Sequence, residues 1–360
     1  MAKFSTADLK KKMGEFPRKN LIHRPTPLQK LENLSRRLGG PEIYIKRDDL
    51  TGLAFGGNKS RKLEFIIQDA LSRKADVIVT WASVQSNWCL QTAAAARKFG
   101  IKPVLLLFKT YDLPEEYDGN LLLDFILDAQ IHLKEAVQGR VVQQEDVEEI
   151  MDETLNEIKE WGYTAYVAPI GGSMVGGSME IPLGAVSYVE AFVELEEQAE
   201  ERGMDFDCVV HATGSGGTQA GLVVGAKALE EGTRVLGISV SDEKEPFSRD
   251  VWTIAQNTVE TLDLDISMEK EDIIVFDDYI KEGYGMVNQE VSDTLRLVSM
   301  EEGIFLDPVY TGKAMVGLID LIKKGYFRKD QKIVFFHTGG TPALFPNKHK
   351  LTGFLQKVKK

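Results

Sequence analysis

Residues 55–62 read Phe-Gly-Gly-Asn-Lys-Ser-Arg-Lys, and this stretch decides which fold and which chemistry to expect. Two glycines let the backbone turn sharply, and the asparagine that follows them is a good helix N-cap. Apolar residues then recur at helical spacing from Leu63 to Leu71. Lys59 is therefore predicted in the first turn of a helix, where the helix dipole disfavours an ammonium and favours a nucleophilic amine. These eight residues alone leave open the alternative that Lys59 is a solvated surface lysine.

Composition limits the classes of protein to which this chain can belong. The 360 residues suffice for two domains, and the shares of hydrophobic residues (43%) and charged residues (27%) are typical of a globular chain. A net charge of -12 argues against nucleic acid or an anionic membrane as a partner, and no apolar run is long enough to span a membrane. Met1–Asp8 lacks the apolar core of a signal peptide, and Cys89 and Cys208 lie far apart. We therefore expect a cytoplasmic protein without a disulfide framework or a metal site.

Short apolar segments alternate with longer amphipathic ones along most of the chain. Strands are predicted at Ile43–Lys46, Val77–Thr80, Pro103–Phe108, Tyr163–Ala168, Cys208–Ala212, Val235–Val240, Ile273–Phe276 and Lys332–His337. Helices are predicted at Lys59–Ser72, Asn87–Phe99, Asn120–Asp128, Val142–Trp161, Pro182–Glu201, Thr218–Glu230, Val287–Glu302 and Gly312–Lys323. This alternation indicates parallel sheets, and its length favours two α/β lobes with a cleft between them. The polar stretch Tyr111–Asp118 is predicted to be a loop.

A second glycine-rich turn joins a predicted strand to a predicted helix. It reads Thr213-Gly214-Ser215-Gly216-Gly217-Thr218. Such a turn presents several backbone N–H groups to one anion, and the helix dipole adds to the attraction. The turn is neither a Walker A sequence nor a dinucleotide fingerprint, so it predicts a site for a single phosphate. The alternative is a tight turn whose glycines only satisfy backbone geometry.

Polar residues also follow the predicted strand at 77–80. Ser86 and Asn87 stand where the next helix begins, and the carboxyl ends of parallel strands are where α/β proteins bind ligands. Read alone, either residue could be a simple N-cap.

Three residues in the C-terminal half of the chain complete the set of candidate site residues. Tyr284 and Tyr310 follow turn residues, so each can stack on a flat ring or move a proton, although ordinary packing is the alternative for either. Thr338 follows the last predicted strand, and its neighbour His337 is expected to be a structural histidine.

Together these pieces describe a site for pyridoxal phosphate, a planar aldehyde that bears one phosphate. Lys59 would form a Schiff base with the aldehyde, and the glycine-rich turn would bind the phosphate. Asn87 would meet the ring hydroxyl, a tyrosine would stack on the ring, and Thr338 would meet the ring nitrogen.

Six motifs, in this order, resemble those of the D-cysteine desulfhydrase and 1-aminocyclopropane-1-carboxylate (ACC) deaminase family. They are Thr26-Pro27-Leu28, Ile45-Lys46-Arg47-Asp48-Asp49-Leu50-Thr51-Gly52, Gly56-Gly57-Asn58-Lys59, Gln85-Ser86-Asn87, Asp307-Pro308-Val309-Tyr310-Thr311-Gly312-Lys313 and His337-Thr338-Gly339-Gly340. The resemblance implies an α/β fold of the two-domain tryptophan-synthase-β-like kind (pyridoxal phosphate fold type II), usually as a homodimer. Residues 1–61 and 166–360 would form the large cofactor-binding domain and residues 62–165 the small domain, with the active site in the cleft between them.

The resemblance also implies residue roles. Catalytic roles fall to Lys59, Ser86, Tyr284 and Tyr310. Cofactor contacts fall to Lys59, Asn87, Thr213, Gly214, Ser215, Gly216, Gly217, Thr218, Tyr310 and Thr338. Substrate contacts fall to Ser86, Asn87, Trp88, Tyr284 and Thr311.

Two pairs of positions bear on the substrate. ACC deaminases carry Glu and Leu where this chain has Thr311 and Thr338, so the resemblance favours α,β-elimination from a 3-substituted alanine, as in D-cysteine desulfhydrases, giving pyruvate, ammonia and the leaving group. Trp88 and Leu90 replace the His and Arg usual in that group, which predicts a larger and less basic pocket unless position 90 faces the core. ACC deaminase or L-cysteate sulfo-lyase activity is the alternative, and the non-enzyme alternative is a pyridoxal phosphate carrier. Ser86 and both tyrosines argue against a carrier.

Overall fold

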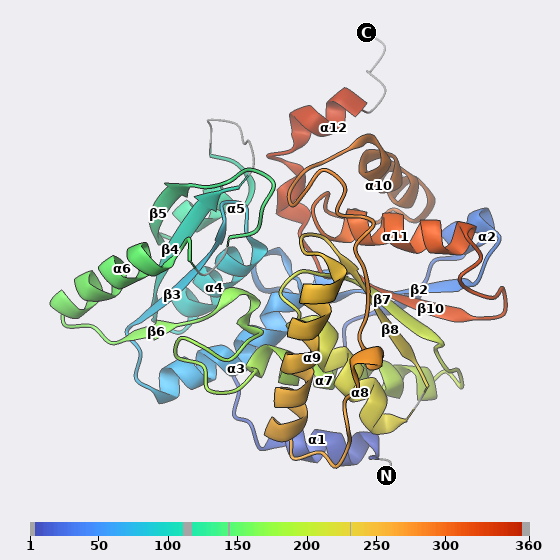
Figure 1. The fold of residues 1–360 in the computed structure, drawn as a ribbon, viewed down its shortest axis with the longest axis horizontal. Coiled ribbons are helices and arrows are strands. Elements are labelled where there is room, and N and C mark those ends of the chain that lie inside the picture. Colours follow the sequence, from blue (N-terminus) through green and yellow to red (C-terminus); the bar gives the residue numbers. More distant parts are fainter. Residues whose placement is uncertain (1–3, 111–116, 143–144, 231, 355–360) are drawn as a thin grey trace.

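The chain folds into two mostly parallel sheets flanked by helices, the expected α/β class (Figure 1). The computed structural model describes residues 4–110, 117–142, 145–230 and 232–354. Most of the predicted loop Tyr111–Asp118 lies outside the described residues, and only Tyr117 and Asp118 are described, without regular structure.

The larger sheet has six strands in the order β1-β2-β10-β7-β8-β9. These are β1 (Leu28–Lys30), β2 (Glu42–Lys46), β10 (Lys332–Phe336), β7 (Cys208–Thr213), β8 (Arg234–Ser239) and β9 (Ile274–Phe276). Only the edge pair β1–β2 is antiparallel. The smaller sheet is parallel throughout, in the order β5 (Gln130–Glu135), β4 (Lys102–Lys109), β3 (Val77–Ser83) and β6 (Ala165–Val167).

The described α-helices are α1 (Thr6–Gly14), α2 (Glu32–Leu38), α3 (Asn58–Ser72), α4 (Asn87–Lys98), α5 (Gly119–Ile126), α6 (Glu148–Glu160), α7 (Leu183–Glu200), α8 (Gly217–Leu229), α9 (Lys244–Thr261), α10 (Gln289–Glu302), α11 (Thr311–Lys323) and α12 (Lys348–Phe354). Short 3-10 helices cover Asp48–Leu50, Leu53–Phe55, Ile170–Gly172, Lys270–Asp272 and Thr341–Leu344.

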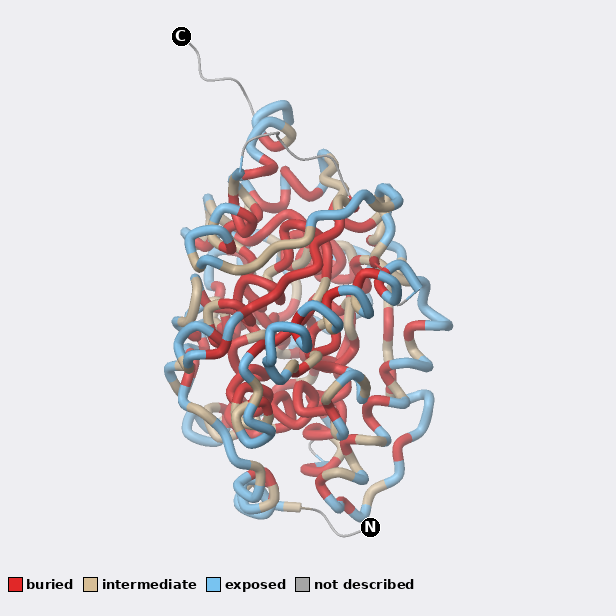
Figure 2. The backbone as a smooth tube through the Cα atoms, turned by 90° about the vertical axis from the view of Figure 1, so that its left-hand side faces the viewer, coloured by how far each residue is buried: buried red, intermediate tan, exposed pale blue. Residues whose placement is uncertain are grey.

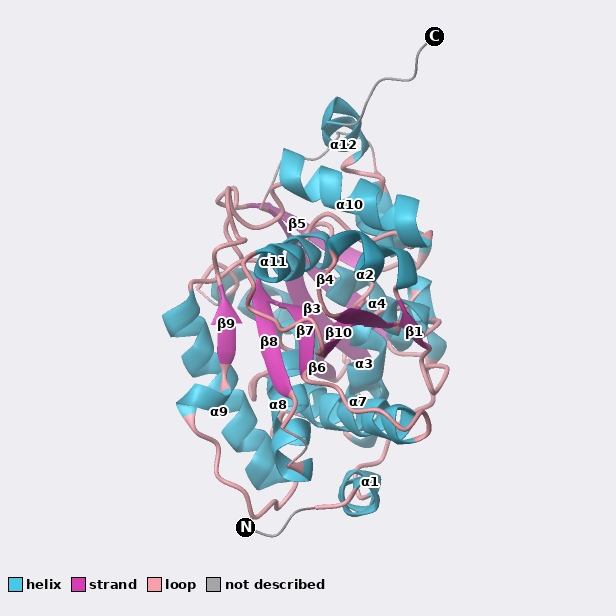
Figure 3. Ribbon diagram, turned by 90° about the vertical axis from the view of Figure 1, so that its right-hand side faces the viewer, coloured by secondary structure: helices cyan, strands magenta, loops and turns pink. Residues whose placement is uncertain are grey.

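The larger sheet is buried on both faces, and its central strands carry apolar residues that point to each side. In β10, Val334 and Phe336 pack against α1, α7, α8 and α9, whereas Ile333 and Phe335 face α2, α10 and α11 on the other side. Figure 3 shows these two helical layers above and below the strands. Continuous apolar runs of this kind are typical of parallel strands that are covered twice.

The smaller sheet is covered in the same way. In β4, Leu105 and Leu107 pack with α3 and α4, and Val104 and Leu106 pack with α6. The buried residues form continuous stretches through the interior, and the exposed residues lie on the outer helices and loops (Figure 2). Among the described helices, none has the length and apolar character that a membrane span requires.

All eight predicted strands are present, and most of the predicted helices differ by one or two residues at their ends. One helix start was wrong by more: the helix predicted from Val142 begins at Glu148, and Val142 instead lies against a cavity described below. The helix predicted from Val287 begins at Gln289, with Asn288 as its N-cap.

The sequence prediction missed α1, α2, α9, α12, β1 and β5. Helix α9 carries Pro246 in its first turn, where a missing N–H costs no helical hydrogen bond. Strand β5 is largely polar and exposed, so its pattern does not show an apolar face.

Candidate active site

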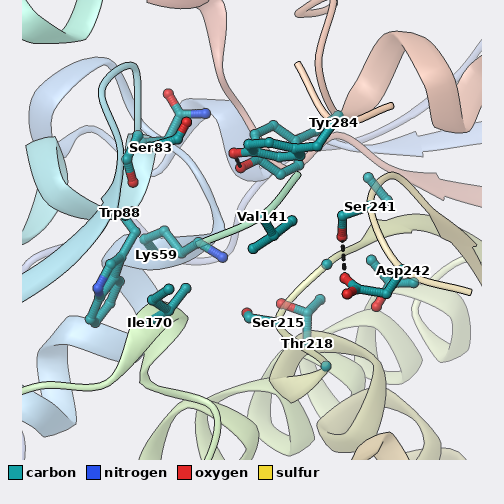
Figure 4. A pocket seen from close by; sticks show the side chains of 18 of the residues that line it. Lys59, Ser83, Trp88, Val141, Ile170, Ser215, Thr218, Ser241, Asp242 and Tyr284 are labelled. Carbon is teal, nitrogen blue, oxygen red and sulfur yellow. Dashed lines mark hydrogen bonds between the residues drawn. The ribbon is translucent and has the colours of Figure 1, made fainter. Parts of the chain in front are cut away.

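A cavity of about 270 Å³ opens where the carboxyl ends of β3, β7, β8 and β10 meet. The two sheets therefore share it. Twelve of the predicted site residues line this cavity: Lys59, Ser86, Asn87, Trp88, Thr213, Gly214, Ser215, Gly216, Thr218, Tyr284, Tyr310 and Thr338. Figure 4 shows the amine of Lys59 pointing into the cavity, with Tyr284 on one side and Ser215 and Thr218 on the other.

The Gly-Gly turn before Lys59 is required by its surroundings. Gly56 has a φ of 74°, and an added Cβ would lie 1.9 Å from the carbonyl oxygen of Asp49. Gly57 has a φ of 133°, and its Cβ would lie 2.6 Å from Nε2 of Gln91. The contact at Gly56 is with backbone, so a side chain there requires backbone movement, and the φ of Gly57 is one that L residues rarely adopt. The turn delivers Lys59 to the end of β10, where the amide of residue 58 donates to the Thr338 carbonyl at 3.0 Å.

The cap of this helix corrects the prediction. Gly57 is the N-cap of α3, and Asn58 is the first helical residue rather than the N-cap. The Asn58 side chain instead donates to Oγ1 of Thr218 at 3.1 Å. It therefore ties the lysine helix to the glycine-rich turn.

Burial lowers the basicity of Lys59. Its amine is surrounded by protein on all sides except the cavity, and this burial lowers the pKa of Lys59 to about 8. A larger fraction of the lysine is therefore a neutral amine near pH 7 than for a solvated lysine.

The glycine-rich turn forms an open cradle at the start of α8. Gly216 is the N-cap, with a φ of 80°, and no side chain among the described residues caps this helix. The hydroxyls of Ser215 and Thr218 line the cavity beside the uncapped turn. The hydroxyl of Thr213 is buried and has no partner among the described residues. Together these donors suit one anion.

A second buried lysine, which sequence reasoning missed, stands behind the cradle. Lys62 is one turn after Lys59 on α3, and its Nζ donates to Oγ of Ser173 at 3.5 Å. Ser173 is in turn 2.9 Å from Oγ of Ser215, hydroxyl to hydroxyl. Burial and the nearby Lys59 keep the pKa of Lys62 well below its usual range. The sequence shows a lysine three residues after Lys59 but not the direction in which its side chain points.

Ser86 and Asn87 are held firmly at the start of α4. Ser86 is the N-cap, and its hydroxyl accepts from the Cys89 amide at 3.2 Å, so the N-cap alternative is correct for this serine. Both residues nevertheless line the cavity. Nδ2 of the buried Asn120 donates to Oδ1 of Asn87 and to the carbonyl of Gln85, each at 2.8 Å. This bracing from α5 was not visible in the sequence.

The two positions on α4 that depart from the family pattern, 88 and 90, face different surroundings. The Trp88 ring lines the cavity, and its Nε1 donates to Oγ1 of Thr80 at 2.6 Å. Leu90 is buried and does not line the cavity. Position 90 therefore faces the protein interior, which is the alternative that the sequence left open.

The two tyrosines meet across 26 residues of sequence. Their hydroxyls form a hydrogen bond, and their rings pack edge to face with centroids 5.9 Å apart. Burial, together with Tyr310, raises the pKa of Tyr284 well above its usual range. Tyr284 therefore remains protonated and able to donate at neutral pH.

Two of the predicted contact residues do not line the cavity. The Thr311 hydroxyl is fully buried and donates to Oδ1 of Asp307 at 2.7 Å, where it holds the first turn of α11. Gly217 packs against Ser173 instead. His337 has the predicted structural role: its Nε2 lies 3.0 Å from the Phe305 carbonyl, and its Nδ1 accepts from the Gly339 amide.

No site role was predicted from the sequence for the other lining residues. They are Asn58, Ala82, Ser83, Val141, Val142, Pro169, Ile170, Met174, Ala212, Ser241, Asp242, Phe247, Asp250 and Gly339. Asp242 lies across the cavity from Lys59 and accepts a hydrogen bond from Ser241 (Figure 4). Burial raises the pKa of the Asp242 carboxyl. A glycine run at residues 171–177 could have drawn attention to the loop that carries Ile170 and Met174.

Comparison with known proteins identifies the class of enzyme. A family described as pyridoxal-phosphate dependent enzyme matches residues 19–339. The chain belongs to this family. A D-cysteine desulfhydrase of Serratia proteamaculans is 42% identical to it over 341 residues, which are 94% of this chain and 98% of that protein. A Pyrococcus furiosus protein, named provisionally as an ACC deaminase, is 42% identical over 346 residues, 95% of this chain and 98% of the relative.

A solved structure agrees with this family assignment. The crystal structure of an ACC deaminase homologue matches this pyridoxal-phosphate dependent enzyme with a TM-score of 0.86 and 38% identity, over 97% of this chain and 99% of that chain. The fold is therefore the expected two-sheet arrangement of fold type II.

The cavity of this pyridoxal-phosphate dependent enzyme fits its cofactor. An amine, an anion cradle and an aromatic ring line one space, which matches the aldehyde, phosphate and pyridine ring of pyridoxal phosphate. The cradle has room at Gly214, where the atom nearest to an added Cβ would be a methyl carbon of Val240 at 3.5 Å. The unpartnered Thr213 hydroxyl offers one more polar atom to a bound group.

Proposed function

We propose that this enzyme catalyses α,β-elimination from a 3-substituted alanine, with D-cysteine as the first candidate substrate. One observation carries the proposal: the Lys59 amine, the anion cradle and the hydrogen-bonded tyrosine pair line a single cavity. The D-cysteine desulfhydrase of Serratia proteamaculans, 42% identical over nearly its whole length, supports the choice of substrate.

Several groups in and behind the cavity would hold the cofactor. Lys59 would attach it covalently, and Ser215, Thr218 and the uncapped amides of α8 would bind its phosphate. Behind that phosphate, Lys62 would donate to Ser173, whose hydroxyl lies 2.9 Å from Oγ of Ser215. Tyr310 would lie against the ring.

Two polar side chains would contact the edges of the pyridine ring. Asn87 would contact the ring oxygen, because Asn120 fixes its orientation, and Thr338 would contact the ring nitrogen. A neutral hydroxyl at that nitrogen is suited to elimination without a long-lived carbanion.

When bound, pyridoxal phosphate draws electrons away from Cα of the amino acid and so acidifies the Cα–H bond. Ser86 and Asn87 would hold the substrate carboxylate at the start of α4. Lys59, with its lowered pKa, would take the Cα proton. Tyr284 would donate a proton to the leaving sulfur, since its raised pKa keeps it protonated. Cysteine and water would thus yield pyruvate, ammonia and hydrogen sulfide.

A substrate panel tests the proposal. The purified enzyme is incubated with D- and L-cysteine, cysteate, 3-chloroalanine, serine and ACC, and pyruvate, ammonia and the leaving group are measured. Pyruvate and sulfide in equal amounts from D-cysteine support it. Absence of pyruvate from every 3-substituted alanine contradicts it, and turnover of any panel member excludes a carrier without catalysis.

ACC deaminase activity is the second candidate, because the Pyrococcus furiosus relative and the solved homologue bear that name. ACC and water would give 2-oxobutyrate and ammonia, so the two activities differ in their keto acid. Borohydride reduction followed by peptide mapping tests the lysine in either case. The label should be on the peptide that contains Lys59.

We also propose the arrangement implied by the resemblance: residues 1–61 and 166–360 as a large domain, residues 62–165 as a small one, and a homodimer in the cytoplasm. The proposed boundary near residue 165 falls within β6, which pairs with β3 of the smaller sheet. Cys89 and Cys208 are buried and unpaired, which suits a reducing compartment. Light scattering during gel filtration gives the oligomeric state.

A further inference from the structure

Lys313 is a buried lysine that belongs to the motif around Tyr310 but has no part in the reaction described above. It lies in the first turn of α11 and is only 1% exposed. Its Nζ donates to the carbonyl oxygens of Ile280 at 2.9 Å and Gly283 at 2.7 Å. Among the described residues, no carboxylate forms an ion pair with this ammonium.

The two carbonyls belong to the turn that presents Tyr284. This turn follows β9 and has little regular backbone pairing: the Gly283 amide donates to the Ile280 carbonyl at 3.2 Å. The Tyr284 amide donates to the Gly139 carbonyl at 2.9 Å. Lys313 therefore fixes the carbonyl side of the turn, while Gly139 fixes its amide side.

The same helix also holds the other tyrosine. Tyr310 is the N-cap residue of α11, and its amide donates to Oδ2 of Asp307 at 2.8 Å. Tyr310 and Lys313 are thus separated by one helical turn. One end of α11 carries Tyr310 directly and reaches the Tyr284 turn through Lys313.

An ammonium at this place is costly. Burial without an ion-pair partner lowers the pKa of Lys313 to about 8. A buried charge of this kind destabilises a protein unless hydrogen bonds compensate for the lost water. Two carbonyls give that compensation here, and both belong to the tyrosine turn.

We propose that Lys313 is a positioning residue that keeps the Tyr284 hydroxyl in hydrogen-bonding register with Tyr310 inside the cavity. The inference rests on the proposed function, in which Tyr284 donates a proton to the leaving group. Lys313 itself does not line the cavity and contacts no reacting atom.

A double-mutant cycle tests this role. Lys313→Met removes the donors with little change in shape, and Tyr284→Phe removes the hydroxyl. Lys313→Met should lower kcat by about tenfold to a hundredfold, the loss expected for a charge-assisted hydrogen bond, with KM nearly unchanged. In the Tyr284→Phe background the same substitution should cost no more than about twofold, the scatter expected of independent effects. Lys323→Met, an exposed position on the same helix, is the matched control and should leave kcat unchanged.

A measurement that does not depend on turnover distinguishes local positioning from a general loss of structure. Hydrogen exchange by mass spectrometry is followed in cofactor-free wild type, Lys313→Met and Lys323→Met. Exchange should accelerate in peptides covering residues 279–287 of the Lys313→Met variant and not in α7 or α8. Lys313→Arg keeps the charge and the donors, so it should restore part of the protection and serves for the cycle if the Met variant does not fold.

The outcomes distinguish the two hypotheses. If Tyr284→Phe retains full turnover, the proposed role of Tyr284 is wrong. If Tyr284→Phe is impaired but Lys313→Met lowers kcat by the same factor in both backgrounds, or exchange rises throughout the protein, Lys313 is merely structural and the inference is overturned.

Discussion

At the scale of single residues, Lys59 illustrates how local sequence and tertiary environment act on the same amine. The Gly-Gly turn sets where α3 begins, and the surrounding protein lowers the pKa of the lysine to about 8. Because only the neutral amine reacts with an aldehyde, the environment decides how readily the cofactor is loaded at physiological pH.

The pH dependence of loading follows from this pKa. The rate at which cofactor-free protein gains the visible absorbance of bound pyridoxal phosphate should rise about tenfold per pH unit below pH 8 and level off above it. Stopped-flow absorbance measures the rate, with N-acetyl-lysine amide as the reference amine. A rate that still rises tenfold between pH 9 and 10, as for the reference amine, would show that burial does not act on Lys59.

Trp88 is the lining residue on which a test of substrate preference should concentrate. Its flat ring faces the cavity, so Trp88→His should lower kcat/KM for S-methylcysteine relative to cysteine by about fourfold, the free energy of burying one methyl group. Leu90→Arg should instead lower the melting temperature, because it introduces an unpaired charge at a buried position. An unchanged substrate ratio in folded Trp88→His would show that the ring does not contact the substituent.

At the scale of elements, the start of α8 contains glycines with different tasks. Gly217 permits close packing, since its added Cβ would lie 2.6 Å from Oγ of Ser173 and 3.0 Å from its Cα. Gly214 faces the cradle, where the added atom would make only ordinary contacts.

Substitution by alanine should affect cofactor binding at Gly214 and thermal stability at Gly217. Gly214→Ala should keep the melting temperature of the cofactor-free protein but weaken cofactor binding by about tenfold or more, because a methyl group displaces a phosphate from one of its hydrogen bonds. Gly217→Ala should lower that melting temperature. Thermal melts and cofactor titration of both variants check this, and equal affinity in Gly214→Ala would place the phosphate elsewhere.

At the scale of the whole molecule, a buried ionic network joins the larger sheet to two helices. Arg61 of α3, two residues after Lys59, donates to Asp48 and to Glu194 of α7. Lys46 of β2 donates to the same Glu194 carboxylate at 2.6 Å. The network therefore holds the lysine helix against the sheet and α7.

Removing one charge from this network should destabilise the entire fold. Glu194→Gln leaves two cations under-compensated and should lower the free energy of unfolding by about 3–5 kcal/mol at neutral pH. The Arg61 guanidinium and the Lys46 ammonium hold the pKa of Glu194 well below its usual value of 4.5, so this stabilisation is present above that pH and is lost as the pH falls.

Urea unfolding of wild type and Glu194→Gln between pH 3 and 7 measures the difference, which should shrink below about pH 4.5. Glu200→Gln, exposed at the end of α7, is the control and should change stability little. A difference between wild type and Glu194→Gln that does not vary with pH would mean that the charge is unimportant.

The sequence by itself determined the features that depend on neighbours along the chain. Apolar runs such as Val77–Thr80 and Lys332–Phe336 are recognisable because parallel strands are buried on both faces. Glycines that precede a helix are recognisable because a turn needs them at fixed spacing. The positions of Lys59 and of the Thr213–Thr218 turn in one cavity followed from these local patterns and the rule that strand ends hold ligands.

Only the tertiary structure decided what each side chain faces. Asn58 and Thr311 carry the right groups for a cap and a contact, yet one bonds Thr218 and the other Asp307. Trp88 and Leu90 are two residues apart on one helix, and packing directs the first to the cavity and the second to the interior. Direction is set by the elements that surround a residue, and these come from distant parts of the chain. The partners of Lys62 and Lys313 were hidden for the same reason.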